Sequence, residues 1–537
     1  MTDPPINSTG AHAQLFRLAR AAADAIERLA VPIYATIVAA FLIIFLVAAH
    51  FLTLEADEAW NLLSIMNAFG IPLPETGALD TPVLTNGGMH MLLHGALAWL
   101  TTSIFAHRVI SIIFTGLLIG IVFRLLKRMD RPTPIAWTGT ALFAAVPNLI
   151  LQASLATAEI IATVLLLVAC MHWLRRGQSS YTQAVASGFL IGLSCATRLN
   201  CLIALPAILI HAVLSGPAWR VRLPRAVVAC SVGGLTTVLG VAAYFLAAHT
   251  GSIQQAQKLF LLSTGLHNGH KSIVRMLFAV VIGNRIIPLW LAAAIAGAYV
   301  ISAAEGPESG ELAPTSLSGL LLLIGLGGLA AWIIKAPIPH VRYMWPAVPF
   351  LWLAGIIAVT QPTIARQKGY PALAFHLFVL AVCGSRMAED ALIIANGESL
   401  TLVYQANSTA PFQLPHKSLR AARDQQALAH FVAAQSGNAH FYAFSAVAFP
   451  ITLLSRRTIS PVTSMGMAGQ RFLILDPADV TVWHPDASFV QWIRSSTTPA
   501  FVSGDFAALR IKDDAGAPPQ PLMFTLGEND VLRPDPK

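Results

Sequence analysis

Long apolar stretches with few or no charges recur along the chain up to about residue 387. The first of them, from about Val31 to Leu52, is long enough as a helix to cross the hydrocarbon core of a bilayer, which is about 30 Å thick. A soluble chain of 537 residues would not need a composition that is 55% hydrophobic and only 11% charged to fill its core. The sequence therefore predicts a polytopic α-helical membrane protein.

The apolar stretches and the basic residues between them predict a topology. We expect about eleven transmembrane helices, at roughly 20 residues per crossing, near residues 31–53, 107–125, 134–151, 154–174, 182–197, 199–215, 226–249, 286–303, 317–335, 343–360 and 371–387. Arginines precede the first span, and further basic loops follow near residues 124–131, 175–176, 220–225 and 366–368. Cytoplasmic loops carry an excess of Lys and Arg, so the amino terminus is expected in the cytoplasm. An odd number of spans places the carboxyl terminus outside.

Three further features of the sequence agree with a polytopic membrane protein. The residues before the first span are polar, unlike a short signal peptide, so this span is expected to remain as an anchor. The formal net charge of +8 does not indicate a nucleic-acid partner, because the basic residues are scattered among short loops. All five cysteines lie in apolar stretches, which predicts neither a disulfide framework nor a thiolate metal site.

The composition becomes more polar from about residue 388. We therefore expect two domains, a membrane domain at 1–387 and a C-terminal domain at 388–537. Patterns in the second domain predict helices at 419–435 and 488–495, strands at 439–446 and 471–475, and a hairpin turn at 501–506. These elements indicate a small α/β domain, which the predicted topology places on the extracytoplasmic side.

The first long loop on that side, about 54–106, has two notable features. Asp57 and Glu58 stand directly after the first span, and an apolar segment beginning at His90 is too short to cross the membrane. We expect this segment to lie along the interface or to dip back. His90 and His94 are four residues apart on its predicted helix, a spacing compatible with metal ligation. Because no carboxylate is placed beside them, we interpret them as an interfacial or acceptor-contacting face and predict no metal.

A second long loop, about 250–285, is basic although few cations are expected on its side of the membrane. Its candidates for binding an anionic group are Lys258, Lys271 and Arg275. Arg342 and Tyr343 lie at the start of a later span, where a guanidinium and a phenol can both donate hydrogen bonds to phosphate oxygens. The alternative for these cations is contact with lipid headgroups at the interface.

Several short motifs occur in an order that resembles one family of membrane enzymes. The motifs are Asp57-Glu58, His107-Arg108-Val109-Ile110-Ser111, Ala156-Thr157-Ala158-Glu159, Ala196-Thr197-Arg198 and His340-Val341-Arg342-Tyr343. Together they resemble the GT-C glycosyltransferases that use polyprenyl-phosphate sugars, such as the bacterial lipid-A aminoarabinose transferases and the protein O-mannosyltransferase-like proteins. The resemblance implies a GT-C-like bundle of transmembrane helices with a small extracytoplasmic domain. The usual His-Pro-Pro after the first-loop acids is missing, and Asp80-Thr81-Pro82 stands nearest.

An enzyme of this kind needs a group that takes the proton from the acceptor hydroxyl and groups that stabilise the departing phosphate. Asp57 is the candidate base. Glu58 points in a different direction from its neighbour and would instead hold geometry or an acceptor cation. The phosphate would be bound by Arg342, Tyr343 and the cations of the second loop. For both acids, the alternative is simple solvation at the end of a span.

Three charged residues within or beside spans are candidates for structural or site-supporting roles: Arg108, Glu159 and Arg198. Charges are costly near hydrocarbon, so they usually have a partner or a function. Arg198 would cap a hairpin between two short spans. Glu159 would pair with Arg108 as a structural brace.

The resemblance thus implies an inverting glycosyltransferase of the bacterial inner membrane, which moves a sugar from a polyprenyl-phosphate donor to a glycolipid, polysaccharide or protein acceptor. Membrane lipids are expected partners and nucleic acid is not. No cofactor is required, and a divalent cation would be compatible with the chemistry but is not predicted. Two alternatives stay open, a flippase or transporter of a lipid-linked solute and a non-enzymatic envelope assembly factor. Transporters tend to contain related halves, and the sequence shows no such repeat.

Overall fold

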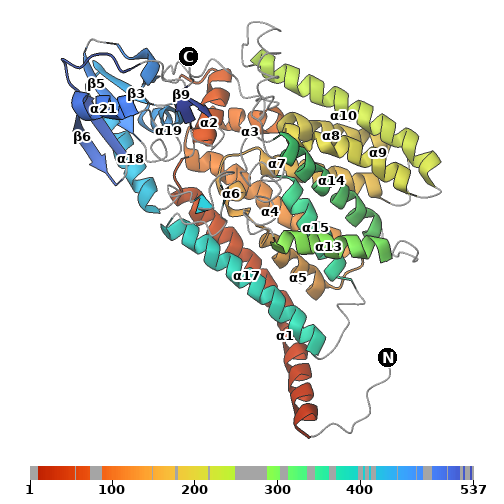
Figure 1. Ribbon diagram of the computed structural model, residues 1–537. Helices are drawn as coiled ribbons and strands as arrows, with labels where there is room; N and C mark the ends of the chain where they lie inside the picture. Colours follow the sequence, from red (N-terminus) through yellow and green to blue (C-terminus); the bar gives the residue numbers. More distant parts are fainter. Residues whose placement is uncertain are drawn as a thin grey trace.

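The structure of the protein is a computed structural model in which the described residues are 10–54, 56–72, 87–147, 149–175, 180–215, 218–247, 287–302, 313–335, 345–361, 370–396, 403–404, 411–412, 419–443, 445–466, 469–475, 487–504, 506–519, 524–526 and 532–534. Within these ranges the chain forms a large helical bundle and, near the carboxyl terminus, a smaller unit of strands and helices (Figure 1).

Helices account for nearly all of the described residues up to residue 396. Their bounds are α1 (Gly10–Phe51), α2 (Ala56–Ala68), α3 (Gly88–Ala98), α4 (Ile104–Arg128), α5 (Thr133–Ala144), α6 (Leu149–Ser154), α7 (Glu159–Leu174), α8 (Tyr181–Thr197), η2 (Leu199–Ile203), α9 (Ala204–Leu214), α10 (Trp219–Ala247), α13 (Ile287–Ser302), α14 (Pro314–Lys335), α15 (Ala347–Val359) and α17 (Tyr370–Asn396). Among the described residues, three segments are long and apolar enough to cross a membrane: Arg17–Phe51, Ile104–Arg128 and Trp219–Tyr244. The protein is therefore a helical membrane protein, and the total of about eleven spans stays a prediction.

Each predicted span overlaps a helix of the structure, but one span was predicted wrongly as continuous. In the range 134–151, α5 ends at Ala144 and α6 begins only at Leu149. Pro147 lies between them, and a proline inside a helix removes a backbone hydrogen bond and clashes with the preceding turn. The interruption separates α6, which packs against α1, from the rest of the predicted span.

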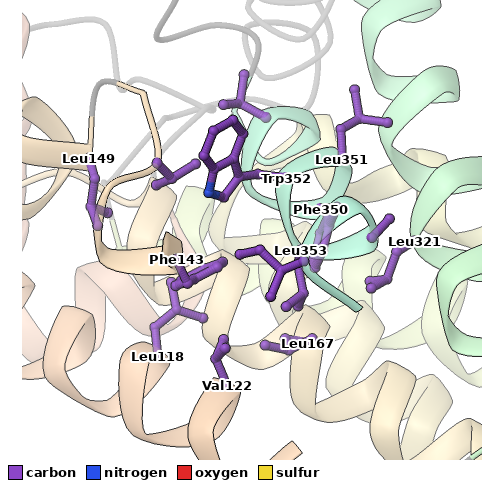
Figure 2. Packing of buried hydrophobic residues seen from close by; sticks show 14 of the residues in the cluster. Leu118, Val122, Phe143, Leu149, Leu167, Leu321, Phe350, Leu351, Trp352 and Leu353 are labelled. Carbon is purple, nitrogen blue, oxygen red and sulfur yellow. The ribbon is translucent and has the colours of Figure 1, made fainter. Parts of the chain in front are cut away.

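The core of the bundle is apolar and continuous across helices that are distant in sequence. Figure 2 shows Leu118 and Val122 of α4, Phe143 of α5 and Leu167 of α7 packed against Phe350–Leu353 of α15. Helices α8 and α10 approach closely because glycine lies at their contact. A Cβ atom added at Gly188 would lie only 2.3 Å from the carbonyl oxygen of Ala229. Small residues allow this kind of close helix packing in membranes.

The predicted first long loop contains two short helices, α2 and α3. The amino-terminal end of α3 is docked on the end of α8, where the N–H of Met89 donates a 3.1 Å hydrogen bond to Oγ1 of Thr197. Gly88 has a φ of +53°, and a Cβ atom there would lie 2.8 Å from the backbone of Ala196 and Thr197. Glycine therefore permits the contact that orients α3 in the bundle.

The carboxyl-terminal unit is built on a five-stranded mixed sheet with the strand order β4-β3-β5-β7-β6. Strand β3 is parallel to β4 and β5, whereas β7 is antiparallel to β5 and β6. The elements are α18 (Leu419–Ala434), β3 (Ala439–Ala443), α19 (Ser445–Ser455), β4 (Ile459–Pro461), β5 (Gln470–Leu475), α21 (Ala487–Ser496), β6 (Thr497–Ser503) and β7 (Phe506–Ile511). Two short two-stranded sheets are also described: β1 (Val403–Tyr404) with β2 (Pro411–Phe412), and β8 (Phe524–Leu526) with β9 (Leu532–Pro534).

The sequence predictions for this unit are confirmed for α18, β5 and α21. The predicted hairpin turn is also present, with Gly504 at a φ of +56° between β6 and β7. The strand predicted at 439–446 is wrong in its second half, because β3 ends at Ala443 and α19 begins at Ser445. Serine is a favoured residue at the start of a helix, and it signals the change of structure there.

The two parts of the molecule meet at the carboxyl end of α1. Helix α17 runs beside α1 and continues past residue 388, where the sequence places the domain boundary, to Asn396 (Figure 1). Helix α19 of the smaller unit packs against α2. The short connection between α1 and α2 therefore lies where the bundle and the smaller unit join.

Candidate active site

The connection between α1 and α2 leads into the two acids predicted for catalysis, and one of them is a buried ion-pair partner. Glu58 is 1% exposed. Its carboxylate accepts hydrogen bonds from Nε and Nη2 of Arg108 in α4, 2.8 and 2.6 Å long. It also accepts a 2.8 Å hydrogen bond from the backbone N–H of Ala156. Bidentate pairs of this kind are strong and geometrically specific, so the Glu58 carboxylate is held in one place.

Arg108 also holds the end of α1. Its Nη1 donates to the carbonyl oxygens of Ala49 and Leu52, at 3.0 and 2.9 Å, and its Nη2 donates to that of Thr53 at 2.9 Å. The last carbonyl groups of a helix have no partner within the helix, and here a guanidinium supplies one. Arg108 is itself buried, and a buried cation needs such a complete set of acceptors. One side chain thus fixes both where α1 ends and where α2 begins.

Asp57 is the second residue of α2 and directly precedes Glu58. Its side chain lies outside the described residues. In sequence Asp57 lies between Thr53 and Glu58. Arg108 binds both of these residues, the first through its carbonyl oxygen and the second through its carboxylate. Successive residues of a helix are turned by about 100° around its axis, so Asp57 does not share the direction of Glu58. The role of Asp57 as a base stays a prediction.

The predicted brace between Glu159 and Arg108 is wrong. Glu159, the first residue of α7, pairs with Arg198, whose Nη2 lies 2.9 Å from its Oε1. Arg198 lies between α8 and η2, so its ion pair connects the α8–η2 junction to the start of α7. This position is close to the predicted one, in which Arg198 caps a hairpin between two short spans. The reason for the different pairing is that Glu58 and the three carbonyl groups at the end of α1 occupy Arg108.

Three buried histidines lie beside this region. His90 and His94 of α3 have ring centroids 4.3 Å apart, and Nδ1 of His94 lies 3.0 Å from Nδ1 of His107 in α4. One of these two nitrogens must therefore be protonated and donate the hydrogen bond, and the other must be unprotonated and accept the hydrogen bond. All three side chains are fully buried, and within the described part of the chain neither ring nitrogen of His90 has a hydrogen-bond partner. His107 was not predicted to join the pair.

The environment of α3 keeps its histidines neutral. Burial, followed by the nearby Arg198 cation, lowers the pKa of His90 from 6.5 to about 3. Burial, followed by His90, lowers the pKa of His94 well below its ordinary value. No group of three or more His, Cys, Asp or Glu side chains among the described residues is placed to hold a metal ion.

The low pKa of His90 predicts that the folded protein loses stability in mild acid. Below about pH 6.5, His90 is protonated in the unfolded chain, whereas in the folded protein it stays neutral down to about pH 3. This difference lowers the free energy of unfolding by about 1.4 kcal/mol for each unit that the pH falls within this range. We expect His90→Gln to reduce the slope of unfolding free energy against pH between pH 6 and 4. The measurement is unfolding of purified protein at a series of pH values, with the exposed His50→Gln as control. An unchanged slope in His90→Gln would contradict the buried neutral histidine.

The residues predicted to bind the donor phosphate all lie outside the described residues. They are Lys258, Lys271, Arg275, Arg342 and Tyr343. The structure therefore brings together, from the predicted site, Glu58 with Arg108 and Glu159 with Arg198, and it places His90 beside His94. It adds two contacts that the sequence analysis did not predict, His107 beside His94 and Gln425 of α18 on the backbone of Leu54.

The sequence matches no protein-family model and no curated protein. Solved structures do match. ArnT from Cupriavidus metallidurans bound to undecaprenyl phosphate is 14% identical, with a TM-score of 0.58 over 90% of this chain and 99% of that chain. An Archaeoglobus fulgidus oligosaccharyltransferase in complex with Zn and sulfate is also 14% identical, with a TM-score of 0.46 over 84% of this chain and 69% of that chain. The match to ArnT confirms, at the level of the fold, the resemblance predicted from the sequence motifs: the chain has the fold of ArnT.

Proposed function

We propose that the chain is an inverting membrane glycosyltransferase that moves a sugar from a polyprenyl-phosphate donor to an envelope acceptor. The observation that carries this proposal is the likeness to ArnT over 90% of the chain, in a structure that holds undecaprenyl phosphate. The acceptor is a glycolipid, a polysaccharide or a protein. The enzyme belongs to the bacterial inner membrane, with its amino terminus in the cytoplasm and its site and C-terminal domain on the extracytoplasmic face.

The proposed reaction is a single displacement at the anomeric carbon. The acceptor oxygen forms the new bond to this carbon and gives its proton to Asp57, while the bond from the carbon to the phosphate oxygen breaks. The electron pair leaves with the polyprenyl phosphate. Asp57 is assigned as the base because Glu58, its acidic neighbour, already has the Arg108 guanidinium and the Ala156 N–H as partners.

The departing phosphate gains negative charge as its bond to the sugar breaks, so cations and hydrogen-bond donors should face it. We assign this task to Arg342 and Tyr343, with further contacts from the basic 250–285 loop through Lys258, Lys271 and Arg275. A guanidinium can donate two parallel hydrogen bonds to a phosphate, which an ammonium does with less geometric control. Support for these assignments comes from the residue types and from the motif resemblance.

Purified protein in nanodiscs should convert a polyprenyl-phosphate sugar and a bacterial envelope extract into a glycosylated acceptor. We expect mass spectrometry to show the acceptor with one added sugar and an equal amount of free polyprenyl phosphate, and NMR to show an inverted anomeric configuration. Nanodiscs without protein are the control. Movement of the donor across vesicle membranes, with no product from glycolipid, polysaccharide or protein acceptors, would contradict the proposal and favour a flippase.

A further inference from the structure

One buried amide side chain joins the C-terminal unit to the segment that leads into the two acids. Gln425 of α18 donates through Nε2 to the carbonyl oxygen of Leu54 at 3.1 Å and accepts through Oε1 from the N–H of Leu54 at 2.9 Å. Gln425 is 4% exposed and Leu54 is 5% exposed. The two residues are 371 positions apart in sequence.

The backbone of Leu54 needs such a partner. Leu54 lies after the last residue of α1, Phe51, and before the first residue of α2, Ala56, so it belongs to neither helix. A buried peptide group without a hydrogen-bond partner is strongly unfavourable, and most buried N–H and C=O groups are therefore paired. The planar amide of Gln425 satisfies both groups at once, which fixes the orientation of the peptide as well as its position.

Neighbouring contacts add to the support of Leu54. Leu453 of α19 is buried with Leu54 in one apolar cluster, whose other buried members are Ala59, Leu62, Leu63, Met66, Ala98 and Ala156. Asp424, next to Gln425, accepts a 2.6 Å hydrogen bond from Oγ of Ser503 at the end of β6. Helix α18 thus binds the sheet of the C-terminal unit through Asp424 and the connection between α1 and α2 of the bundle through Gln425.

The segment before Asp57 is consequently held from two sides. Arg108 binds the carbonyl group of Thr53 from within the bundle, and Gln425 binds both backbone groups of Leu54 from the C-terminal unit. Asp57 follows three residues later. We propose that Gln425 is a positioning residue, through which the C-terminal domain sets the place of Asp57 relative to the bound substrates. This inference rests on the proposed function of Asp57.

The test replaces Gln425 by methionine, which has a similar length and shape but cannot bond both backbone groups. A displacement of about 1 Å at a reacting group can cost about a hundredfold in rate, so we expect Gln425→Met to lower kcat by about 10- to 100-fold. The KM for the donor should stay within about twofold. Hydrogen exchange at residues 52–58, measured by mass spectrometry in nanodiscs, should become faster. Gln426→Met on the same helix is the matched control, since Gln426 is exposed, and it should leave kcat, KM and exchange unchanged.

The outcomes separate this inference from the proposed function. If exchange at 52–58 rises while kcat per folded molecule is unchanged, Gln425 only joins the domains, and its positioning role is overturned. If exchange does not rise, the anchor itself is overturned. If wild-type protein forms no product with any acceptor, the proposed function fails, whereas the exchange result still reports on the anchor.

A measurement on wild-type protein keeps the inference testable if Gln425→Met does not fold. The Leu54 amide lies outside any helix, and without a partner it would exchange as fast as an open loop. We expect it to exchange about as slowly as the buried amides of α1. Loop-like exchange at Leu54 in the wild type would overturn the proposed anchor.

Discussion

Asp57→Asn is expected to lower the turnover of sugar transfer by about two to four orders of magnitude, the usual range for removing a general base. Asparagine keeps the size and the hydrogen-bonding capacity of aspartate but cannot accept the proton of the acceptor hydroxyl. Donor binding should change little, because the lost interaction develops only as the acceptor attacks. The measurement is product formation in nanodiscs, with donor binding determined separately.

The control for this variant is Glu55→Gln, which removes a neighbouring carboxylate that we interpret as a solvated acid at the end of the span. It tests whether a loss of negative charge near the start of α2 is sufficient to reduce activity. Near-normal turnover in well-folded Asp57→Asn would remove Asp57 from the role of base. Equal losses in both variants would indicate a general electrostatic effect.

Arg108→Ala is expected to destabilise the protein by about 3–5 kcal/mol, the usual cost of removing one partner of a buried ion pair. The substitution leaves the buried carboxylate of Glu58 without its cation and also removes the donors to three carbonyl groups at the end of α1. Chemical unfolding of the purified protein measures the change. The yield of folded protein should fall with it.

The matched control is Arg386→Ala in α17. Arg386 pairs with Glu389 one turn further along the same helix, and its side chain is 19% exposed. Because the Arg386 side chain is more solvated than that of Arg108, whereas the Glu389 side chain is only 7% exposed, we expect a measurable loss that is smaller than that of Arg108→Ala. The double variant Arg108→Met with Glu58→Gln should recover part of the lost stability, since it removes both charges and keeps an acceptor for the N–H of Ala156. No recovery would indicate that the carbonyl contacts, not the ion pair, dominate.

The helices of the bundle could be predicted because length and apolarity act locally. A stretch such as the one ending at Leu52 has few alternatives to a membrane helix, and turn chemistry located the hairpin at Gly504 equally well. The limits of these patterns appear where local signals compete. The apolar residues after Ala443 suit a strand as well as a helix, and only the serine at the start of α19 distinguishes the two.

The pairing of charges could not be predicted, because it depends on which helices lie side by side. Glu58 and Glu159 are almost equally far from Arg108 in sequence, and the packing of α4 against the end of α1 selects Glu58. Sequence spacing grouped His90 with His94 because both lie on one helix, whereas His107 joins them from α4. Gln425 gave no signal, since a glutamine in an amphipathic helix is usually a solvated residue.

The partners of the connection between α1 and α2 become available at very different times during synthesis. Arg108 follows Glu58 by 50 residues and Ala156 follows it by 98, but Gln425 follows Leu54 by 371. At about 5–20 residues per second, translation needs roughly 20 to 70 seconds to proceed from Leu54 to Gln425. During this interval the nascent bundle can already insert into the membrane while the backbone of Leu54 still lacks its final partner. Assembly of the C-terminal domain therefore comes last, and a ribosome that stops early would leave a membrane-embedded chain with its acidic segment unanchored.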